Sequence, residues 1–264
     1  MRVALWQFDA SGDKAANLAK VLAGVAAAAE AGAGLVVFPE YAMFWERVVG
    51  PEVGRQAESL DGPFVAAVRA AAAERRIAVV LNVFESNPAD PRPWNTVIAL
   101  DESGETAGVY RKAHLYDAFG YRESDAFSAG PVAAATVVTL AGLRVGLQVC
   151  YDLRFPEGAR SAVDAGAELI LYPAAWVPGP RKEQHWRTLL AARAIENTAY
   201  VAGVGMTFPA GTAGTQLVDP SGAVLGEVPG GEAMLLVEVD GAALAGVRTK
   251  NPSLANRRFA VAPR

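Results

Sequence analysis

The chain has 264 residues, of which 52% are hydrophobic, with one cysteine and a formal net charge of −4. This composition can bury a sizeable core, which excludes a disordered chain, and the slight acidity gives no electrostatic case for nucleic-acid binding. One cysteine excludes an intrachain disulfide, and a free thiol without a preceding signal-peptide pattern leads us to expect a cytoplasmic protein.

The N-terminal part predicts a strand, a helix and a second strand. Val3 to Phe8 is the first strand, Asp13 is a candidate N-cap, and apolar residues from Leu18 to Val25 repeat at helical spacing. Leu35 to Phe38 is a short apolar strand that ends just before Glu40. This order implies that the two strands pair in parallel through a right-handed crossover.

The apolar stretch over residues 21–38 raises the question of a membrane span. Glu30 and three glycines interrupt it, and its two halves differ in pattern. We therefore expect a helix followed by a strand, and no membrane partner.

The next part predicts one helix and three strands between two loops. A helix starts at Pro63, a strand covers residues 77–84, and strands 95–100 and 105–111 form a hairpin that ends just before Lys112. Residues 41–60 and 114–130 have little pattern, so they are expected to be loops.

The remaining chain repeats the alternation of strands and helices. The expected elements are a hairpin over 136–140 and 143–149, a helix from Pro156, strand 168–172, helix 184–196, strand 200–206, a hairpin over 216–218 and 223–227, strand 234–239 and a weakly patterned tail over 241–264.

The balance of elements predicts the fold class. Many strands, few helices and no linker indicate one α/β domain over residues 1–264, with two sheets packed together and helices on the outer faces.

Cys150 follows the apolar strand 143–149 and precedes the helix that starts at Pro156. Open α/β sheets place their sites at such strand ends, and a helix N-terminus favours a thiolate. The alternative is that a lone free cysteine is a small buried hydrophobic residue.

Glu40 and Lys112 also follow strands, so a carboxylate, an ammonium and a thiol can meet at one sheet edge. In acyl transfer, Glu40 would be the general base for Cys150, and Lys112 with the backbone N–H of Tyr151 would stabilise the oxyanion. The alternative for each residue taken by itself is that Glu40 is a solvated turn residue and Lys112 a surface charge at the end of a hairpin.

A Cys–His mechanism is the competing interpretation, with His114 or His185 as the base. Neither histidine has an obvious orienting partner in the sequence. Metal-ligand spacings, a complete dinucleotide fingerprint and a phosphate loop are missing from the sequence, so we expect no metal and no cofactor.

Three segments in this order resemble the nitrilase superfamily of carbon–nitrogen hydrolases: Val36-Val37-Phe38-Pro39-Glu40, Tyr110-Arg111-Lys112-Ala113-His114-Leu115 and Cys150-Tyr151-Asp152-Leu153-Arg154-Phe155-Pro156-Glu157. The resemblance implies a four-layer α-β-β-α sandwich, a homodimer or higher homo-oligomer and no cofactor. It also implies a general base at Glu40, an oxyanion stabiliser at Lys112, a nucleophile at Cys150 and a second glutamate, Glu123, that holds Lys112.

The third segment is most similar to the amidase branch that includes the ω-amidases and the deaminated-glutathione amidases. Substrates of that branch are small amides that carry a carboxylate, which Arg154 could bind. The alternative for Arg154 is an ion pair with Asp152 or Glu157, and Trp176 is either a pocket wall or part of the core.

The resemblance therefore implies a thiol amidase that releases ammonia through a Cys thioester. The alternatives are an N-carbamoyl amine hydrolase, a nitrilase, and a catalytically silent binding protein on the same scaffold.

Overall fold

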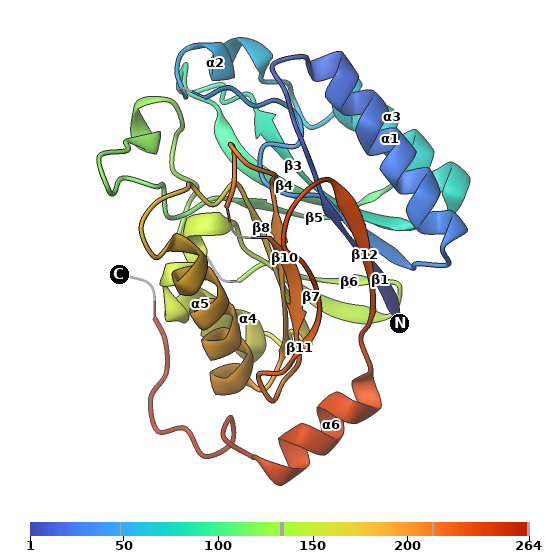
Figure 1. The fold of residues 1–264 in the computed structure, drawn as a ribbon, viewed down its shortest axis with the longest axis vertical. Coiled ribbons are helices and arrows are strands. Elements are labelled where there is room, and N and C mark those ends of the chain that lie inside the picture. The colour runs from blue at the N-terminus through green and yellow to red at the C-terminus, as the bar shows by residue number, and fades with distance from the viewer. Residues whose placement is uncertain (48, 133–134, 213, 263–264) are drawn as a thin grey trace.

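Two six-stranded sheets lie at the centre of the computed structural model, which describes residues 1–47, 49–132, 135–212 and 214–262 (Figure 1). The first sheet contains β1 (Arg2–Gln7), β2 (Leu35–Val37), β3 (Ala78–Glu85), β4 (Trp94–Leu100), β5 (Thr106–Arg111) and β12 (Ala233–Glu238). The second contains β6 (Val137–Leu140), β7 (Leu143–Leu147), β8 (Leu169–Ala174), β9 (Tyr200–Gly205), β10 (Thr215–Val218) and β11 (Val224–Val228).

Helices cover the outer face of each sheet. Helices α1 (Lys14–Glu30) and α3 (Pro63–Arg75) lie side by side on the first sheet, and α4 (Pro156–Asp164) and α5 (Lys182–Asn197) cover the second (Figure 1). The structure therefore confirms the expected four-layer α-β-β-α sandwich.

The alternation of side chains along the strands accounts for these layers. In β1, Val3 and Leu5 belong to the apolar core between the two sheets, whereas Ala4 packs in the core beneath α1 and α3. Successive strand residues point to opposite faces, and both faces are covered. A continuous apolar run is therefore what such a strand needs.

Two sequence signals at helix starts are confirmed. The Asp13 carboxylate accepts hydrogen bonds from the backbone N–H groups of Ala15 and Ala16, which would otherwise lack partners at the start of α1. Pro156 is the first residue of α4, where the missing N–H costs nothing.

Strand directions bring distant segments to one edge of the molecule. The sheet orders are β12-β1-β2-β3-β4-β5 and β11-β10-β9-β8-β7-β6. Strands β1, β2 and β3 pair in parallel, as expected for β1 and β2, and so do β7, β8 and β9. Because β4 is antiparallel to both β3 and β5, β5 runs in the same direction as β3. The C-terminal ends of β2 and β5 thus share one edge.

The tail is more ordered than its pattern indicated. Helix α6 spans Gly241–Lys250, and the side chain of Asp240 accepts a hydrogen bond from the N–H of Ala242 at its start. The Asp240 cap ahead of alanines and Leu244 is a helix signal, so the expectation of a weakly patterned tail was wrong here. Beyond α6, Arg257 forms an ion pair with Asp164 of α4. Residues 263–264 of the expected tail lie outside the described residues.

A further difference concerns the segment 41–60, which was expected to be loop throughout. It contains the short helix α2 (Glu52–Gln56).

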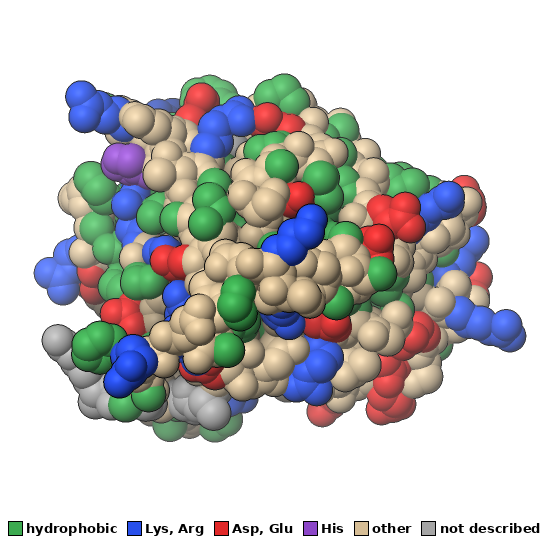
Figure 2. Space-filling model, turned by 90° about the horizontal axis from the view of Figure 1, so that it is seen from below, with side chains coloured by type: hydrophobic (Ala, Val, Ile, Leu, Met, Phe, Trp, Pro, Cys, Tyr) green, Lys and Arg blue, Asp and Glu red, His purple; other side chains and the backbone are tan. Residues whose placement is uncertain are grey.

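None of the helices within the described ranges has the length and apolar character to cross a membrane. Acidic and basic side chains are interspersed over the face shown in Figure 2.

Candidate active site

A cavity of about 290 Å³ lies at the edge of the molecule that holds the C-terminal ends of β2 and β5. Glu40, Lys112, Glu123 and Cys150 all line it. Glu40 follows β2, Lys112 follows β5 and Cys150 follows β7, so three elements far apart in sequence each supply one side chain. The cavity volume is at the small end of the roughly 300–1,000 Å³ typical of ligand pockets, which suits a small substrate.

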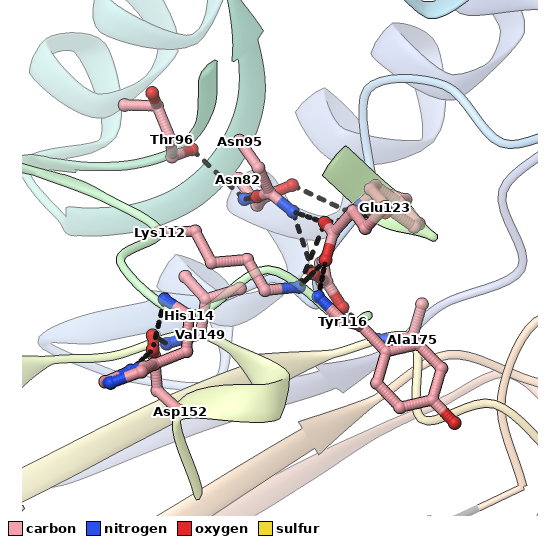
Figure 3. Close-up of polar contacts among 12 residues, drawn as sticks. Asn82, Asn95, Thr96, Lys112, His114, Tyr116, Glu123, Val149, Asp152 and Ala175 are labelled. Atoms are coloured by element: carbon pink, nitrogen blue, oxygen red, sulfur yellow. Dashed lines mark hydrogen bonds and ion pairs between the residues drawn. The ribbon is translucent and has the colours of Figure 1, made fainter. Parts of the chain in front are cut away.

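The ammonium group of Lys112 lies between two carboxylates, and all three side chains are buried. Lys112 Nζ is 2.8 Å from Glu40 Oε1 and 2.8 and 3.0 Å from the two oxygens of Glu123 (Figure 3). We call Glu40, Lys112 and Glu123 the ionic cluster. Buried charges of this kind persist only when they are paired and hydrogen bonded.

The two carboxylates of the ionic cluster differ in their remaining capacity. Glu123 Oε1 also accepts from Tyr41 Oη at 3.1 Å, and Glu123 Oε2 accepts from the N–H of Tyr116 at 2.6 Å. Glu40 Oε2 accepts from the N–H of Ala175 at 2.8 Å. Glu123 is thus surrounded by donors on both oxygens, while Glu40 Oε2 retains capacity for a proton.

A buried asparagine pair supports the ionic cluster from behind. Asn95 Nδ2 donates to Glu40 Oε1 at 2.8 Å and to Glu123 Oε1 at 3.0 Å, and Asn82 Nδ2 donates to Asn95 Oδ1 at 2.6 Å (Figure 3). The chain of donors fixes the carboxylate orientations. Our sequence reasoning missed both asparagines, although a polar residue inside the otherwise apolar strands β3 and β4 is the signal that could have found them.

Cys150 has φ = +43°, in the left-handed region that costs a non-glycine residue about 1–2 kcal/mol. The fold holds this turn through the buried carboxylate of Asp152, which accepts from the N–H of Val149 at 2.9 Å and from Tyr110 Oη at 2.9 Å. Such backbone strain persists where the surroundings enforce it, often at functional sites. Here it orients the thiol towards the cavity.

Burial, then the charge of Glu40 and a hydrogen bond to it, raise the pKa of the Cys150 thiol well above its ordinary value, although Lys112 opposes the shift. The thiol is therefore protonated at neutral pH. The sequence led us to expect a thiolate favoured by a helix N-terminus, but α4 begins only at Pro156, and burial with the charge of Glu40 sets the direction of the pKa shift instead.

The pKa of Lys112 has the opposite balance. Burial alone would lower it, but the negative charges of Glu123 and Glu40 outweigh burial and raise the pKa of Lys112 well above its ordinary value. Lys112 is therefore a permanent cation beside the thiol, and the carboxyl group of Glu40 is the hydrogen-bond partner of that thiol.

The histidines do not line the cavity. His114 Nδ1 is 2.7 Å from Asp152 Oδ1, and its ring stacks on Phe155 at a centroid distance of 3.8 Å. His185 Nδ1 is 3.3 Å from Arg154 Nη2. This placement gives no support to a Cys–His pair.

The predicted binding residues have different positions. Tyr151 and Trp176 line the cavity, and Arg154 does not. The Arg154 guanidinium lies 4.9 Å from the centroid of Trp176, and within the described chain it forms no ion pair with Asp152 or Glu157. Trp176 is also nearly fully buried, so it belongs to both the pocket wall and the core.

Lys182 also lines the cavity, and no pattern in the sequence indicated it as a site residue. Only 5% of its surface is exposed, and its Nζ donates to Tyr116 Oη at 2.6 Å.

Among the described residues, no group of three or more His, Cys, Asp or Glu side chains is arranged to hold a metal ion.

The chain is similar to known proteins over nearly its whole length. The family model described as "Carbon-nitrogen hydrolase" matches residues 2–249. The chain is 37% identical over 237 residues to a deaminated glutathione amidase of Escherichia coli O157:H7, covering 89% of each chain.

Two solved structures are similar over nearly the whole chain. The Caenorhabditis elegans NitFhit protein superposes with a TM-score of 0.89 at 30% identity, covering 97% of this chain and 65% of that one. An amidase from Nesterenkonia sp. AN1 superposes with a TM-score of 0.83 at 30% identity, covering 98% of this chain and 94% of that one. That structure is of a mutant with the acetamide moiety of fluoroacetamide added covalently at the active site cysteine.

Proposed function

The chain belongs to the carbon–nitrogen hydrolase family, and on this premise we propose that it is an amidase that releases ammonia from a small linear amide carrying a carboxylate. The observation that carries the proposal is one small cavity lined together by the thiol of Cys150, the carboxylate of Glu40 and the ammonium of Lys112. These are the groups that acyl transfer through a thioester needs.

In the acylation step, Glu40 takes the proton of the Cys150 thiol as the sulfur attacks the amide carbon. The raised pKa of Cys150 makes this transfer necessary, because the free thiol is not ionised at neutral pH. The oxyanion of the tetrahedral intermediate is stabilised by Lys112 and by the backbone N–H of Tyr151. Glu40 then gives its proton to the nitrogen, the C–N bond breaks and ammonia leaves.

In the second step, water cleaves the thioester. Glu40, ionised again, takes a proton from the water as its oxygen attacks the acyl carbon, and the C–S bond breaks with return of that proton to Cys150. The products are ammonia and a carboxylic acid. Glu123 contributes by position, because its two oxygens hold Lys112 Nζ at 2.8 and 3.0 Å.

The relatives support the amide as substrate. One carries the name of an amidase, and another is an amidase whose structure contains a covalent adduct at its cysteine. The small cavity favours a small linear amide, and the cationic side chain of Lys182 in its lining favours one with a negative charge.

A matched set of three compounds tests the proposal: succinamate, N-carbamoylglycine and 3-cyanopropanoate. They carry an amide, a ureido group or a nitrile at similar distances from one carboxylate. We expect ammonia and succinate from succinamate at the highest kcat/KM of the three. The Cys150→Ala variant is the matched control.

The outcomes separate the alternatives. Preferential release of carbon dioxide and glycine, together with ammonia, from N-carbamoylglycine would replace the amidase by an N-carbamoyl amine hydrolase. Faster turnover of the nitrile would indicate a nitrilase. Binding of these compounds without turnover of any of them would favour a catalytically silent binding protein.

We also propose that the protein is a homodimer or a higher homo-oligomer. Ile195 on α5 is half-exposed, which supports a second copy packing on the helices of the second sheet. Light scattering after size exclusion should give at least twice the 27.6 kDa of one chain. A mass equal to one chain at micromolar concentration would contradict this proposal.

A further inference from the structure

Lys182 is a buried cation for which the described residues supply no anionic partner. Its side chain lines the cavity, yet no carboxylate in the described part of the chain lies within ion-pair distance of its Nζ. A buried charge normally requires a partner of opposite sign. This position therefore differs from that of Lys112, which has two such partners in the same cavity.

Aromatic rings and a second cation surround Lys182. Its Nζ lies 4.2 Å from the ring centroid of Phe119 and 4.7 Å from that of Tyr116. The Arg154 guanidinium lies 4.9 Å from the ring centroid of Trp176, which Lys182 Nζ also approaches to 5.6 Å. We call Lys182 and Arg154, with these three rings, the cationic wall. Cation–π contacts partly offset the cost of burying the positive charge, but they do not neutralise it, so Lys182 still attracts an anion.

The hydroxyl of Tyr116 adds a second donor at the same place. Because an ammonium group has only donors, the Tyr116 oxygen must accept the 2.6 Å hydrogen bond from Lys182. The phenolic hydrogen then remains available, and within the described residues it has no acceptor. Lys182 and Tyr116 thus offer two adjacent donors to the cavity, which matches the two oxygens of one carboxylate.

Arg154 is less suited to direct contact. It does not line the cavity, its Nη2 faces His185 Nδ1 at 3.3 Å, and its guanidinium lies over Trp176. It therefore adds positive charge behind the ring.

We propose that Lys182 Nζ and Tyr116 Oη bind the carboxylate of the amide substrate and set the preference for anionic amides. This inference rests on the proposed amidase function and assigns to Lys182, rather than Arg154, the contact with the substrate.

The test compares succinamate with levulinamide, in which a methyl ketone replaces the carboxylate at the same chain length. For Lys182→Met we expect kcat/KM for succinamate to fall about 10- to 100-fold through KM, since hydrogen bonds to charged groups have this magnitude. With levulinamide the change should stay within about twofold. Lys182→Arg should restore much of the loss, and Tyr116→Phe should lose about three- to tenfold on succinamate alone.

Lys250→Met is the matched control, because Lys250 is an exposed lysine on α6. A merely structural role for Lys182 would lower kcat/KM for both amides equally, and this result would overturn the inference. Equal kcat/KM for the two amides in the wild-type protein would also overturn it.

A binding measurement keeps the inference separate from the proposed function. In the Cys150→Ala background, titration calorimetry should show tighter binding of succinamate than of levulinamide, and the added Lys182→Met change should abolish the difference. If wild type releases ammonia but this difference is unchanged by Lys182→Met, the inference alone fails. If no amide is turned over while Lys182→Met still removes succinamate binding, the proposed function alone fails.

Discussion

The ionic cluster and the cationic wall lie at one cavity, which Lys112 and Lys182 both line, and they accommodate buried positive charge in opposite ways. In the cluster, Lys112 is matched by two carboxylates that further donors hold in place. In the wall, Lys182 and Arg154 face aromatic rings and, among the described residues, no carboxylate pairs with either. The first arrangement is complete within the protein, so it suits chemistry on any bound amide. The second is completed only by an anion from outside, so it suits recognition.

The largest effect should come from breaking the ionic cluster. Lys112→Met leaves Glu40 and Glu123 buried without their cation, which we expect to lower the free energy of unfolding by about 3–5 kcal/mol. Loss of an oxyanion donor should lower kcat about 10²- to 10³-fold or more for succinamate and levulinamide alike. Urea denaturation and ammonia release measure the two effects.

If Lys112→Met does not fold, Glu123→Gln is the milder variant, because it leaves Lys112 with the carboxylate of Glu40. The variant should lower kcat for succinamate and levulinamide alike. A fall in kcat for succinamate alone would contradict the assignment of chemistry to the ionic cluster and of substrate recognition to the cationic wall.

Glu40→Gln should separate thiol reactivity from amidase activity. Without its base, kcat should fall about 10²- to 10⁴-fold for both amides. Because the charge of Glu40 raises the pKa of Cys150, its removal should lower that pKa, so iodoacetamide should alkylate the variant faster at a given alkaline pH. The chain has one cysteine, so intact mass reports this reaction alone. Slower alkylation of the variant would contradict the assigned cause of the shift.

The pH dependence of KM should distinguish the cationic wall from the ionic cluster. Burial first, and then the charge of Arg154, lower the pKa of Lys182, whereas Cys150 acts in the opposite direction. As pH rises through this lowered pKa, Lys182 loses its charge, so KM for succinamate should rise while KM for levulinamide stays constant.

Tyr116 should not contribute to that change, since burial first, and then the charge of Cys150, raise its pKa to about 12. A rise in KM of equal size for both amides would assign the titration to the shared chemistry instead of to the wall.

The smallest effect is expected at the exposed edge of the wall. Phe119 is 71% exposed, and its ring centroid is 4.2 Å from Lys182 Nζ. An exposed cation–π contact contributes about 0.5–1 kcal/mol, so Phe119→Ala should raise KM for succinamate about two- to fivefold. Phe259→Ala is the matched control, because Phe259 is 92% exposed and lies in the tail. Equal changes in the two variants would show that Phe119 does not contribute to the binding of succinamate.

The same contrast explains what could be predicted from the sequence. Glu40, Lys112 and Cys150 each follow an apolar strand, and strand direction alone brings them to one edge. Their joint place in the cavity was therefore foreseeable. Glu123 begins a single turn of 3-10 helix (Glu123–Asp125) in a segment that was expected to be loop, and only the family resemblance selected it.

The cationic wall was hidden for a physical reason. Lys182 is the first residue of α5, and it meets Tyr116 and Phe119 only because the loop after β5 folds across the cavity. No periodicity or spacing encodes a contact between residues that far apart. The sequence drew attention to Arg154, which follows the cysteine, whereas the cationic side chain that reaches the cavity comes from α5, beyond α4 and β8.

In the proposed mechanism the Cys150 thiol is the nucleophile, and the ionic cluster supplies its base and its oxyanion stabiliser. The most direct test compares ammonia release from succinamate by Cys150→Ala and by the wild-type protein. The melting temperature of both proteins is measured alongside. We expect ammonia release by Cys150→Ala to fall to the buffer background while the protein stays folded. Turnover retained in that variant would contradict the covalent mechanism.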